Sequence, residues 1–161
     1  MISFKFAEEN LRKINEVLNK YPSKKPALMP VLYIAQEQNG FISNEVIREV
    51  ASILELTPEE VLGVITFYTM YHQNPVGKYH IQVCTNVSCM LRGGYDIFDK
   101  VKQKLGIDHL QVTEDKIFSL EEVECMGSCG TAPMIAVNED YYEKLTTTGV
   151  IELLDSLNKK N

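Results

Sequence analysis

The sequence predicts two units of different fold class: an α-helical N-terminal bundle, residues 1–75, followed by a small α/β domain, residues 76–161. The hydrophobic period carries this prediction, because apolar residues recur at helical spacing before residue 75 and alternate with polar residues directly after it. The turn sequence Asn74-Pro75-Val76-Gly77 places the boundary between the two units. The chain as a whole is therefore expected to belong to the α+β or α/β class.

The composition is that of a globular protein with an acidic surface. The chain has 161 residues, of which 45% are hydrophobic and 24% charged, which is enough apolar material to bury a sizeable core. The formal net charge of −6, without a basic tract, argues against nucleic acid or an anionic membrane as a partner. No segment approaches the roughly 20 apolar residues that span a bilayer, so we expect no direct membrane insertion. The N-terminal residues show no export signal, and we therefore expect a cytoplasmic, reducing compartment.

Four helices are expected in residues 1–75. The best-marked start is Thr57-Pro58-Glu59-Glu60, which has a threonine cap, a proline at the first helical position and a glutamate where a capping box requires one. The apolar positions at helical spacing are Leu11, Ile14, Leu18 and Tyr21 in the first helix, Leu28, Val31, Leu32 and Ala35 in the second (which stops at Asn39-Gly40), Val46, Ile47, Val50 and Leu54 in the third (capped by Ser43), and Val61, Leu62, Val64 and Ile65 in the fourth.

The α/β domain is expected to alternate strands and helices. Residues 79–84 alternate between apolar and polar side chains and predict a first strand that ends at Cys84. The other predicted elements are strands at 117–124, 134–138 and 141–145, a helix that carries Ile97, Val101 and Leu105 and ends at Gly106, and a terminal helix around 150–157.

The four cysteines are the candidate metal-binding residues. Cys84 and Cys89 form a Cys-x4-Cys pair, and Cys125 and Cys129 form a Cys-x3-Cys pair 35 residues further along. Each pair follows a predicted strand and lies in a segment rich in Gly, Ser and Thr. In a reducing compartment, four cysteines in two close pairs indicate metal binding rather than disulfides. A 2Fe–2S cluster needs two thiolates on each iron, so we expect each pair to hold one iron.

Zinc sites, thiol–disulfide enzymes and inert buried thiols also use cysteines. A structural zinc site also uses four cysteines, but its usual pairs are Cys-x2-Cys, and neither pair here has that spacing. A thiol–disulfide enzyme would show the same Cys-x2-Cys motif. Buried, inert thiols fit poorly with two pairs in flexible loops. The spacing favours an iron–sulfur site and leaves zinc as the alternative.

Residues beside the cysteines could support an anionic centre. Gly93-Gly94 follows Cys89 and offers flexible backbone and a helix N-terminus, both of which favour negative charge nearby. Arg92 adds a cation, although an exposed solubilising charge explains it equally well. Pro133 is expected to fix the loop before the third strand, with a cis peptide bond.

The remaining polar and aromatic candidates are expected to be structural, and no catalytic residue is expected. The histidines have no cysteine at ligand spacing, so strand or surface positions are favoured over metal ligation. The aromatic run is expected in core or interface contacts, and the paired acids on a solvated edge. These candidates are His72, His80 and His109, residues 67–71, and the pairs Glu121-Glu122 and Glu139-Asp140.

Two longer motifs surround the cysteines. The first runs D-K-I-F-S at residues 115–119 and C-M-G-S-C-G-T-A-P at residues 125–133. The second runs F-Y-T-M-Y at residues 67–71 and P-V-G-K-Y at residues 75–79, and continues to the cysteine pair that begins at Cys84. Together they resemble the signature of the 24-kDa (E-subunit) family of respiratory complex I, NADH-quinone oxidoreductase. The resemblance covers essentially the whole chain, and all four cysteines match the ligand positions of the family.

The resemblance implies a thioredoxin-like ferredoxin fold that carries one 2Fe–2S cluster in an electron-transfer subunit. It implies a partner, the flavin- and NADH-binding subunit of the 51-kDa (F-subunit) type, which holds FMN and NADH, and a place in the peripheral arm of a membrane-attached or soluble complex. The same module also serves NAD-linked hydrogenases and formate dehydrogenases, which is one alternative. The alternative from another class is a zinc-stabilised interaction module without a redox role.

Overall fold

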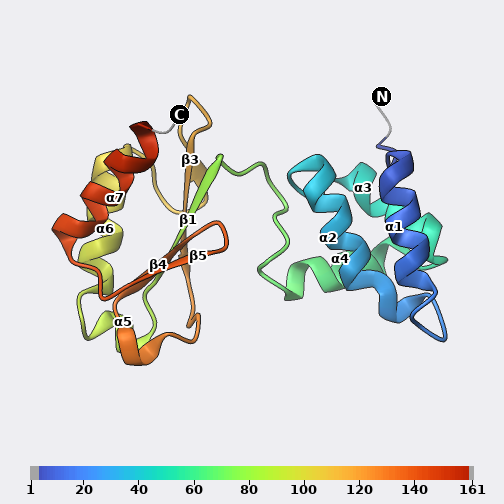
Figure 1. Cartoon of the computed structure of the whole chain (residues 1–161), viewed down its shortest axis with the longest axis horizontal. Coiled ribbons are helices and arrows are strands. Elements are labelled where there is room, and N and C mark those ends of the chain that lie inside the picture. The colour runs from blue at the N-terminus through green and yellow to red at the C-terminus, as the bar shows by residue number, and fades with distance from the viewer. Residues whose placement is uncertain (1–3, 160–161) are drawn as a thin grey trace. The chain divides into compact units, whose positions relative to one another are not determined.

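The computed structural model describes residues 4–159, which divide between Pro75 and Val76 into two compact units (Figure 1). In the described part of the chain, the first unit is helical, and the second combines helices with one five-stranded sheet. The predicted order, helices first and an α/β unit second, is confirmed. None of the helices described in residues 4–159 has the length and apolar composition of a membrane span.

The helical unit packs its helices around one apolar core. The predicted inward faces supply this core: Ile14, Val31, Leu32, Val50 and Leu54 are all at most 1% exposed. The helices are α1 (Glu8–Leu18), the short 3₁₀ helix η1 (Lys25–Ala27), α2 (Leu28–Asn39), α3 (Asn44–Leu54) and α4 (Pro58–Phe67). The expectation that the first helix reaches Tyr21 is wrong, because α1 ends at Leu18 and Tyr21 is 38% exposed.

The helix ends in this unit follow their capping residues. Thr57 and Glu60 form the predicted capping box, in which the Glu60 N–H donates to Thr57 Oγ1 at 3.2 Å and the Thr57 N–H donates to Glu60 Oε2 at 3.1 Å. Such a cap typically contributes about 1 kcal/mol. Gly40 ends α2 with a φ of 82°, a left-handed conformation that suits glycine. Ser43 caps α3 by accepting from the Val46 N–H at 3.4 Å.

The sheet of the second unit is mixed, with strand order β2-β3-β1-β4-β5. The central strand β1 pairs parallel with β3 and antiparallel with β4, and the edge strands β2 and β5 pair antiparallel with their neighbours. The strands are β1 (Tyr79–Cys84), β2 (Gln111–Val112), β3 (Phe118–Val123), β4 (Met134–Val137) and β5 (Asp140–Glu143), and the helices are α5 (Val87–Met90), α6 (Gly94–Leu105), the 3₁₀ helix η2 (Cys129–Thr131) and α7 (Thr147–Lys159).

One face of the sheet forms the core with α6 and α7, which lie side by side (Figure 1). Ile81 and Val83 of β1, Leu120 of β3 and Ile135 of β4 are fully buried in this core. Because side chains alternate along a strand, the residues between them point to the opposite face. That face carries a buried polar cluster from β1 and β3.

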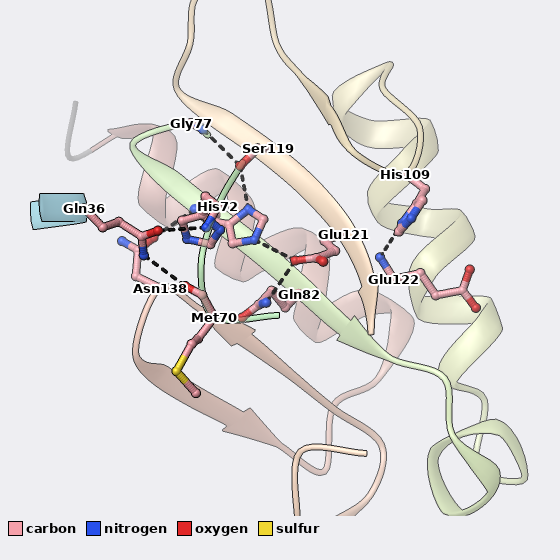
Figure 2. Close-up of polar contacts among 11 residues, drawn as sticks. Gln36, Met70, His72, Gly77, Gln82, His109, Ser119, Glu121, Glu122 and Asn138 are labelled. Carbon is pink, nitrogen blue, oxygen red and sulfur yellow. Dashed lines mark hydrogen bonds and ion pairs between the residues drawn. The ribbon is translucent and has the colours of Figure 1, made fainter. Parts of the chain in front are cut away.

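The polar cluster corrects one expectation. Ser119 Oγ accepts from the Gly77 N–H at 3.0 Å and lies 2.8 Å from His80 Nδ1, while His80 Nε2 lies 2.9 Å from Glu121 Oε2 (Figure 2). Gln82 Nε2 also donates to Glu121 Oε2, at 3.0 Å. The prediction of a solvated edge for Glu121 is therefore wrong, because β3 lies inside the sheet, between β1 and β2.

The second acidic pair behaves as expected. Glu139 and Asp140 are exposed where β4 turns into β5, and β5 is an edge strand.

Two short elements, β2 and α5, were not predicted from the sequence. Their lengths of two and four residues are too short to show a hydrophobic period.

Candidate metal centre

The first cysteine pair lies at the carboxyl end of the central strand. Cys84 is the last residue of β1, and Cys89 lies in α5, so the two are joined by a tight strand-to-helix connection. Both side chains are buried, with 2% of each residue exposed. Ala132 and Met134 pack with them in a small apolar cluster of their own. This pair is therefore held in a fixed and largely dry environment.

The second pair lies in the loop that follows β3. Cys125 comes two residues after the strand ends, and Cys129 begins η2. Gly127 between them has a φ of 90°, which allows the loop to turn back. The two Sγ atoms are 3.3 Å apart, and both cysteines are exposed. This pair therefore faces solvent, in contrast to the first.

Side-chain hydrogen bonds tie the two cysteine loops together. Thr85 Oγ1 donates to Glu122 Oε1 at 2.7 Å, and Asn86 Nδ2 donates to Glu124 Oε2. Both bonds join the segment after β1 to the end of β3. The Ser88 hydroxyl, from α5, donates to the Cys129 sulfur. The segments that follow the parallel strands β1 and β3 therefore stay in contact through their side chains.

The four thiols interact across the two pairs. Burial is the main cause that raises the pKa of Cys89 to about 11, and the neighbouring Cys84 and Cys129 act in the same direction. The pKa of Cys125 lies below its usual value, chiefly because the Gly127 N–H donates to its sulfur. The pKa of Cys129 is raised by its hydrogen bond with Cys125, with a contribution from Cys84. These mutual effects show that the two pairs lie close enough to influence each other.

Hydrogen-bond donors reach three of the four sulfurs. The Gly127 N–H donates to Cys125, the Met134 N–H to Cys89, and the Ser88 hydroxyl to Cys129. Donors of this kind stabilise negative charge on sulfur and tune the potential of a bound metal cluster. Sequence reasoning missed Ser88 and Met134, because nothing in a linear motif indicates that their donors meet a sulfur.

The glycine run after Cys89 has a role that the sequence did not reveal. A Cβ atom on Gly94 would lie 2.9 Å from the Cys84 carbonyl oxygen and 3.0 Å from the Cys89 carbonyl group. The backbone at the start of α6 thus approaches the first cysteine pair more closely than any side chain would allow. The expected helix start after the cysteine loop is confirmed at Gly94.

Two further residues beside the cysteines are placed by the structure. Arg92 is exposed, and its Nη1 donates to the Ala132 carbonyl oxygen at 3.4 Å, which links the segment after α5 to the segment after Cys129. The peptide bond between Ala132 and Pro133 is cis, as predicted.

The histidines make contacts of a different kind. His80 belongs to the polar cluster on β1 and β3, and His109 Nδ1 accepts from the Glu122 N–H at 2.9 Å (Figure 2). The His72 N–H donates to Gln36 Oε1 at 2.7 Å.

Among residues 4–159, no three His, Cys, Asp or Glu side chains are placed to hold a single metal ion. The cysteines come as two pairs, which matches a cluster of two irons with two thiolates on each.

The fold and the paired cysteines define an α/β ferredoxin unit that follows a helical bundle in the sequence, and comparison with known proteins identifies the class. The model of the thioredoxin-like [2Fe-2S] ferredoxin family matches residues 14–158. The chain belongs to this family, whose cofactor is a 2Fe–2S cluster. The resemblance found in the sequence, and with it the thioredoxin-like fold, is confirmed.

Curated relatives refine the comparison. The chain is 44% identical over 158 residues to the E subunit of NADH-quinone oxidoreductase from Rickettsia bellii, covering 96% of this chain and 95% of the relative. It is 43% identical over 157 residues to "NADH dehydrogenase [ubiquinone] flavoprotein 2, mitochondrial" of Dictyostelium discoideum, covering 96% of this chain and 64% of that longer relative.

A solved structure shares the fold. An NAD+-reducing [NiFe]-hydrogenase in the H2-reduced state matches with a TM-score of 0.70 at 18% identity over 81% of this chain. This chain spans 22% of the length of that hydrogenase chain, so the likeness concerns the fold of one part of it.

The contact at Gly94 leads to a first prediction. Gly94→Ala places a methyl group against the carbonyl groups of Cys84 and Cys89, so either α6 or the first cysteine pair must shift. We expect this variant to retain clearly less iron and sulfide per chain after reconstitution, as measured by metal analysis and visible absorbance.

Gly63→Ala is the matched control. Gly63 lies within α4, and a Cβ atom there meets nothing within 4 Å. Alanine at an unobstructed helical position is about 0.5–1 kcal/mol more stable than glycine. Equal cluster content in the two variants would contradict the role given to Gly94.

Proposed function

We propose that this chain is the electron-transfer subunit of an NADH-quinone oxidoreductase, in which it carries one 2Fe–2S cluster next to the flavin- and NADH-binding subunit. The observation that carries the proposal is the meeting of two cysteine pairs at the carboxyl ends of the parallel strands β1 and β3. Relatives named as the E subunit of that complex, at 42% and 44% identity over nearly the whole chain, support the same function.

The four cysteines are the proposed ligands. Cys84 and Cys89 would hold one iron, and Cys125 and Cys129 the other, because each pair shares one loop and the Sγ atoms of the second pair already lie 3.3 Å apart. When bound, the cluster supplies one-electron transfer. With four thiolates and two sulfides its formal charge is about −2 when oxidised and about −3 when reduced.

The chain's own part in this function is to hold and stabilise negative charge. The donors from Gly127, Met134 and Ser88 point at ligand sulfurs and lower the cost of an added electron. The buried pair excludes water on one side, whereas the exposed pair leaves the other side open to an electron donor. In this role the chain passes electrons and does no bond-making chemistry on NADH or quinone.

A partner must supply the NADH chemistry. The nine glycines of the sequence form no G-x-G-x-x-G turn, which a Rossmann dinucleotide site needs for its close approach to pyrophosphate. A hydride also delivers two electrons, whereas this cluster accepts one, so a flavin has to stand between them. The proposed partner is the flavin- and NADH-binding subunit of the 51-kDa (F-subunit) type, within the peripheral arm of the complex and on the cytoplasmic side.

The helical unit is proposed to dock that partner. It contains none of the cysteines, yet it exposes large apolar side chains at the end of α4 and on α2. Phe67 is 76% exposed, Leu62 43%, Tyr33 42% and Met70 40%. Two residues of the aromatic run have the expected core role: Tyr71 is 3% exposed and donates through its hydroxyl to the Met29 carbonyl oxygen, and Tyr68 is partly buried against the same core.

The second candidate is the same module within a soluble NAD-linked hydrogenase or formate dehydrogenase. The fold match to the hydrogenase chain favours it, but at 18% identity, well below the 44% identity to the relative from NADH-quinone oxidoreductase. A zinc-stabilised interaction module would use the same four thiols, and the colour of the purified protein separates it, since zinc gives no visible absorbance.

The ligand assignment predicts that each cysteine is required. Cys84→Ala, Cys89→Ala, Cys125→Ala and Cys129→Ala each remove a thiolate from one iron, so each variant should lose the red-brown cluster or hold it only weakly. Serine at the same position should retain part of the cluster with a shifted spectrum, because oxygen replaces sulfur. Iron, zinc and sulfide analysis with visible spectroscopy measures this, and a normal cluster in Cys125→Ala would refute the assignment.

Because the proposed function places the flavin on a partner subunit, we expect that the isolated protein does not react with NADH. Under anaerobic conditions, excess NADH should leave the visible absorbance of the oxidised protein unchanged, because the chain has no flavin to split the electron pair. The absorbance should bleach once the flavoprotein partner is added. Rapid bleaching by NADH without any flavin would contradict the proposed need for a partner.

The docking role of the helical unit is tested at its most exposed aromatic side chain. Phe67→Ala should weaken binding of the flavoprotein partner about tenfold, as expected for loss of an apolar anchor worth about 1.4 kcal/mol. Leu11→Ala on α1, at a residue 39% exposed, is the control and should bind normally. Binding by calorimetry and cluster content are measured for both, and unchanged affinity in Phe67→Ala would contradict this surface.

A further inference from the structure

We propose that Cys125 and Cys129 form a reversible disulfide when the chain is without its cluster and meets a hydroperoxide. This inference rests on the proposed function in one respect: the same two residues are the ligands of one iron. The disulfide itself depends only on the geometry of the loop after β3.

The exposed pair is close to bonding geometry. Its Sγ atoms lie 3.3 Å apart, and a disulfide needs about 2.05 Å, so an approach of about 1.3 Å completes the bond. The loop between the two cysteines contains Gly127 in a left-handed conformation, and these residues lie outside the strand ladder. Small backbone rotations in this loop can therefore bring the sulfurs together.

The buried pair is protected from the same reaction. Cys84 and Cys89 are each 2% exposed, so a dissolved oxidant does not reach them without local opening. Cys84 is also fixed within β1, which is paired on both sides, and the backbone of Gly94 lies against both residues. The four cysteines thus separate into one pair that can be oxidised and one that cannot.

The chemistry balances in two steps with one equivalent of hydrogen peroxide. A sulfur of the exposed pair attacks the peroxide, the O–O bond breaks, and the products are a sulfenic acid and water. The second thiol then attacks the sulfenic sulfur, the S–S bond forms, and a second water leaves with the thiol proton. The two thiols lose two electrons and two hydrogens in total, and the peroxide is reduced by two electrons.

The disulfide has a consequence for cluster loading. It removes both sulfurs that would hold one iron, so the oxidised chain cannot accept a cluster until a dithiol reduces it. It also stops oxidation at a reversible stage, because a sulfur in a disulfide does not proceed directly to the irreversible sulfinic acid. The loop after β3 would therefore protect an unloaded chain.

Two proteolytic peptides provide a direct readout. Cleavage after lysine and arginine leaves Cys84 and Cys89 together in residues 79–92, and Cys125 and Cys129 together in residues 117–144. The cluster-free full chain is treated with one equivalent of hydrogen peroxide, alkylated with N-ethylmaleimide and digested without reductant. Peptide 117–144 should be two hydrogens lighter, about 2 Da, and take no alkyl group, while peptide 79–92 takes two.

A second measurement follows iron and sulfide uptake. The peroxide-treated chain should fail to load a cluster, and dithiothreitol should restore loading. Cys84→Ser keeps the exposed pair and should still form the disulfide. Cys129→Ser should give a sulfenic acid or a linked dimer at Cys125 with one equivalent of peroxide, and sulfinic acid only after a second equivalent. A disulfide in peptide 79–92, a bond between the two peptides, or direct over-oxidation of Cys125 in the native sequence would overturn the proposal.

The failure of this inference can be told apart from failure of the proposed function. If the reduced chain loads a cluster normally but peptide 117–144 keeps two free thiols after peroxide, the disulfide is refuted and the function stands. If peptide 117–144 loses two hydrogens but the reduced chain loads no cluster, the disulfide stands and the assigned ligands are wrong.

Discussion

The parallel pairing of β1 with β3 is the constraint on which the rest of the site depends. Parallel strands need a crossover connection, which α6 provides between them, and their carboxyl ends then lie at the same edge of the sheet. Cys84 is the register partner of Val123, so Cys125 follows only two residues beyond the level of Cys84. Two motifs separated by 35 residues in sequence thereby become neighbours, and the Ser88 hydroxyl can reach the sulfur of Cys129.

The two pairs are brought together but remain different in kind. The first belongs to the folded core, since Cys84 and Cys89 pack with Ala132 and Met134 and are held by β1 and α5. The second belongs to a loop that turns at a glycine and faces solvent. One side of the site therefore has a fixed geometry before any metal binds, and the other side can adjust to it. This asymmetry follows from the fold, because a strand end is rigid whereas the loop after β3 lacks ladder partners.

Local sequence signals predicted the structural features that depend on neighbouring residues. They failed for features that depend on residues distant in the sequence. The capping box at Thr57, the helix stop at Gly40 and the strand before Cys84 were all readable, because each rests on a few adjacent side chains. Glu121 was misjudged, since its environment depends on β3 lying between two other strands. The close approach of Gly94 was missed for the same reason: the atoms that a Cβ would meet belong to the cysteine backbone, not to a motif. The resemblance to the family implied a particular set of ligands, which remains a prediction, whereas spacing alone left the site open to zinc.

The charges around the cysteines show how an acidic chain can hold an anionic cluster. The carboxylates nearest the two loops accept hydrogen bonds from neutral side chains. In each bond the donor and the carboxylate belong to different segments, so the bond links those two segments. The sulfurs themselves receive N–H and O–H donors rather than cations. Dipoles at hydrogen-bond distance act on the sulfurs directly, whereas the carboxylates oppose an added electron from further away and through solvent. The donors therefore act on the sulfurs more strongly than the carboxylates do. The carboxylate contacts are Glu122 with Thr85, Glu124 with Asn86, and Glu143 with Thr131.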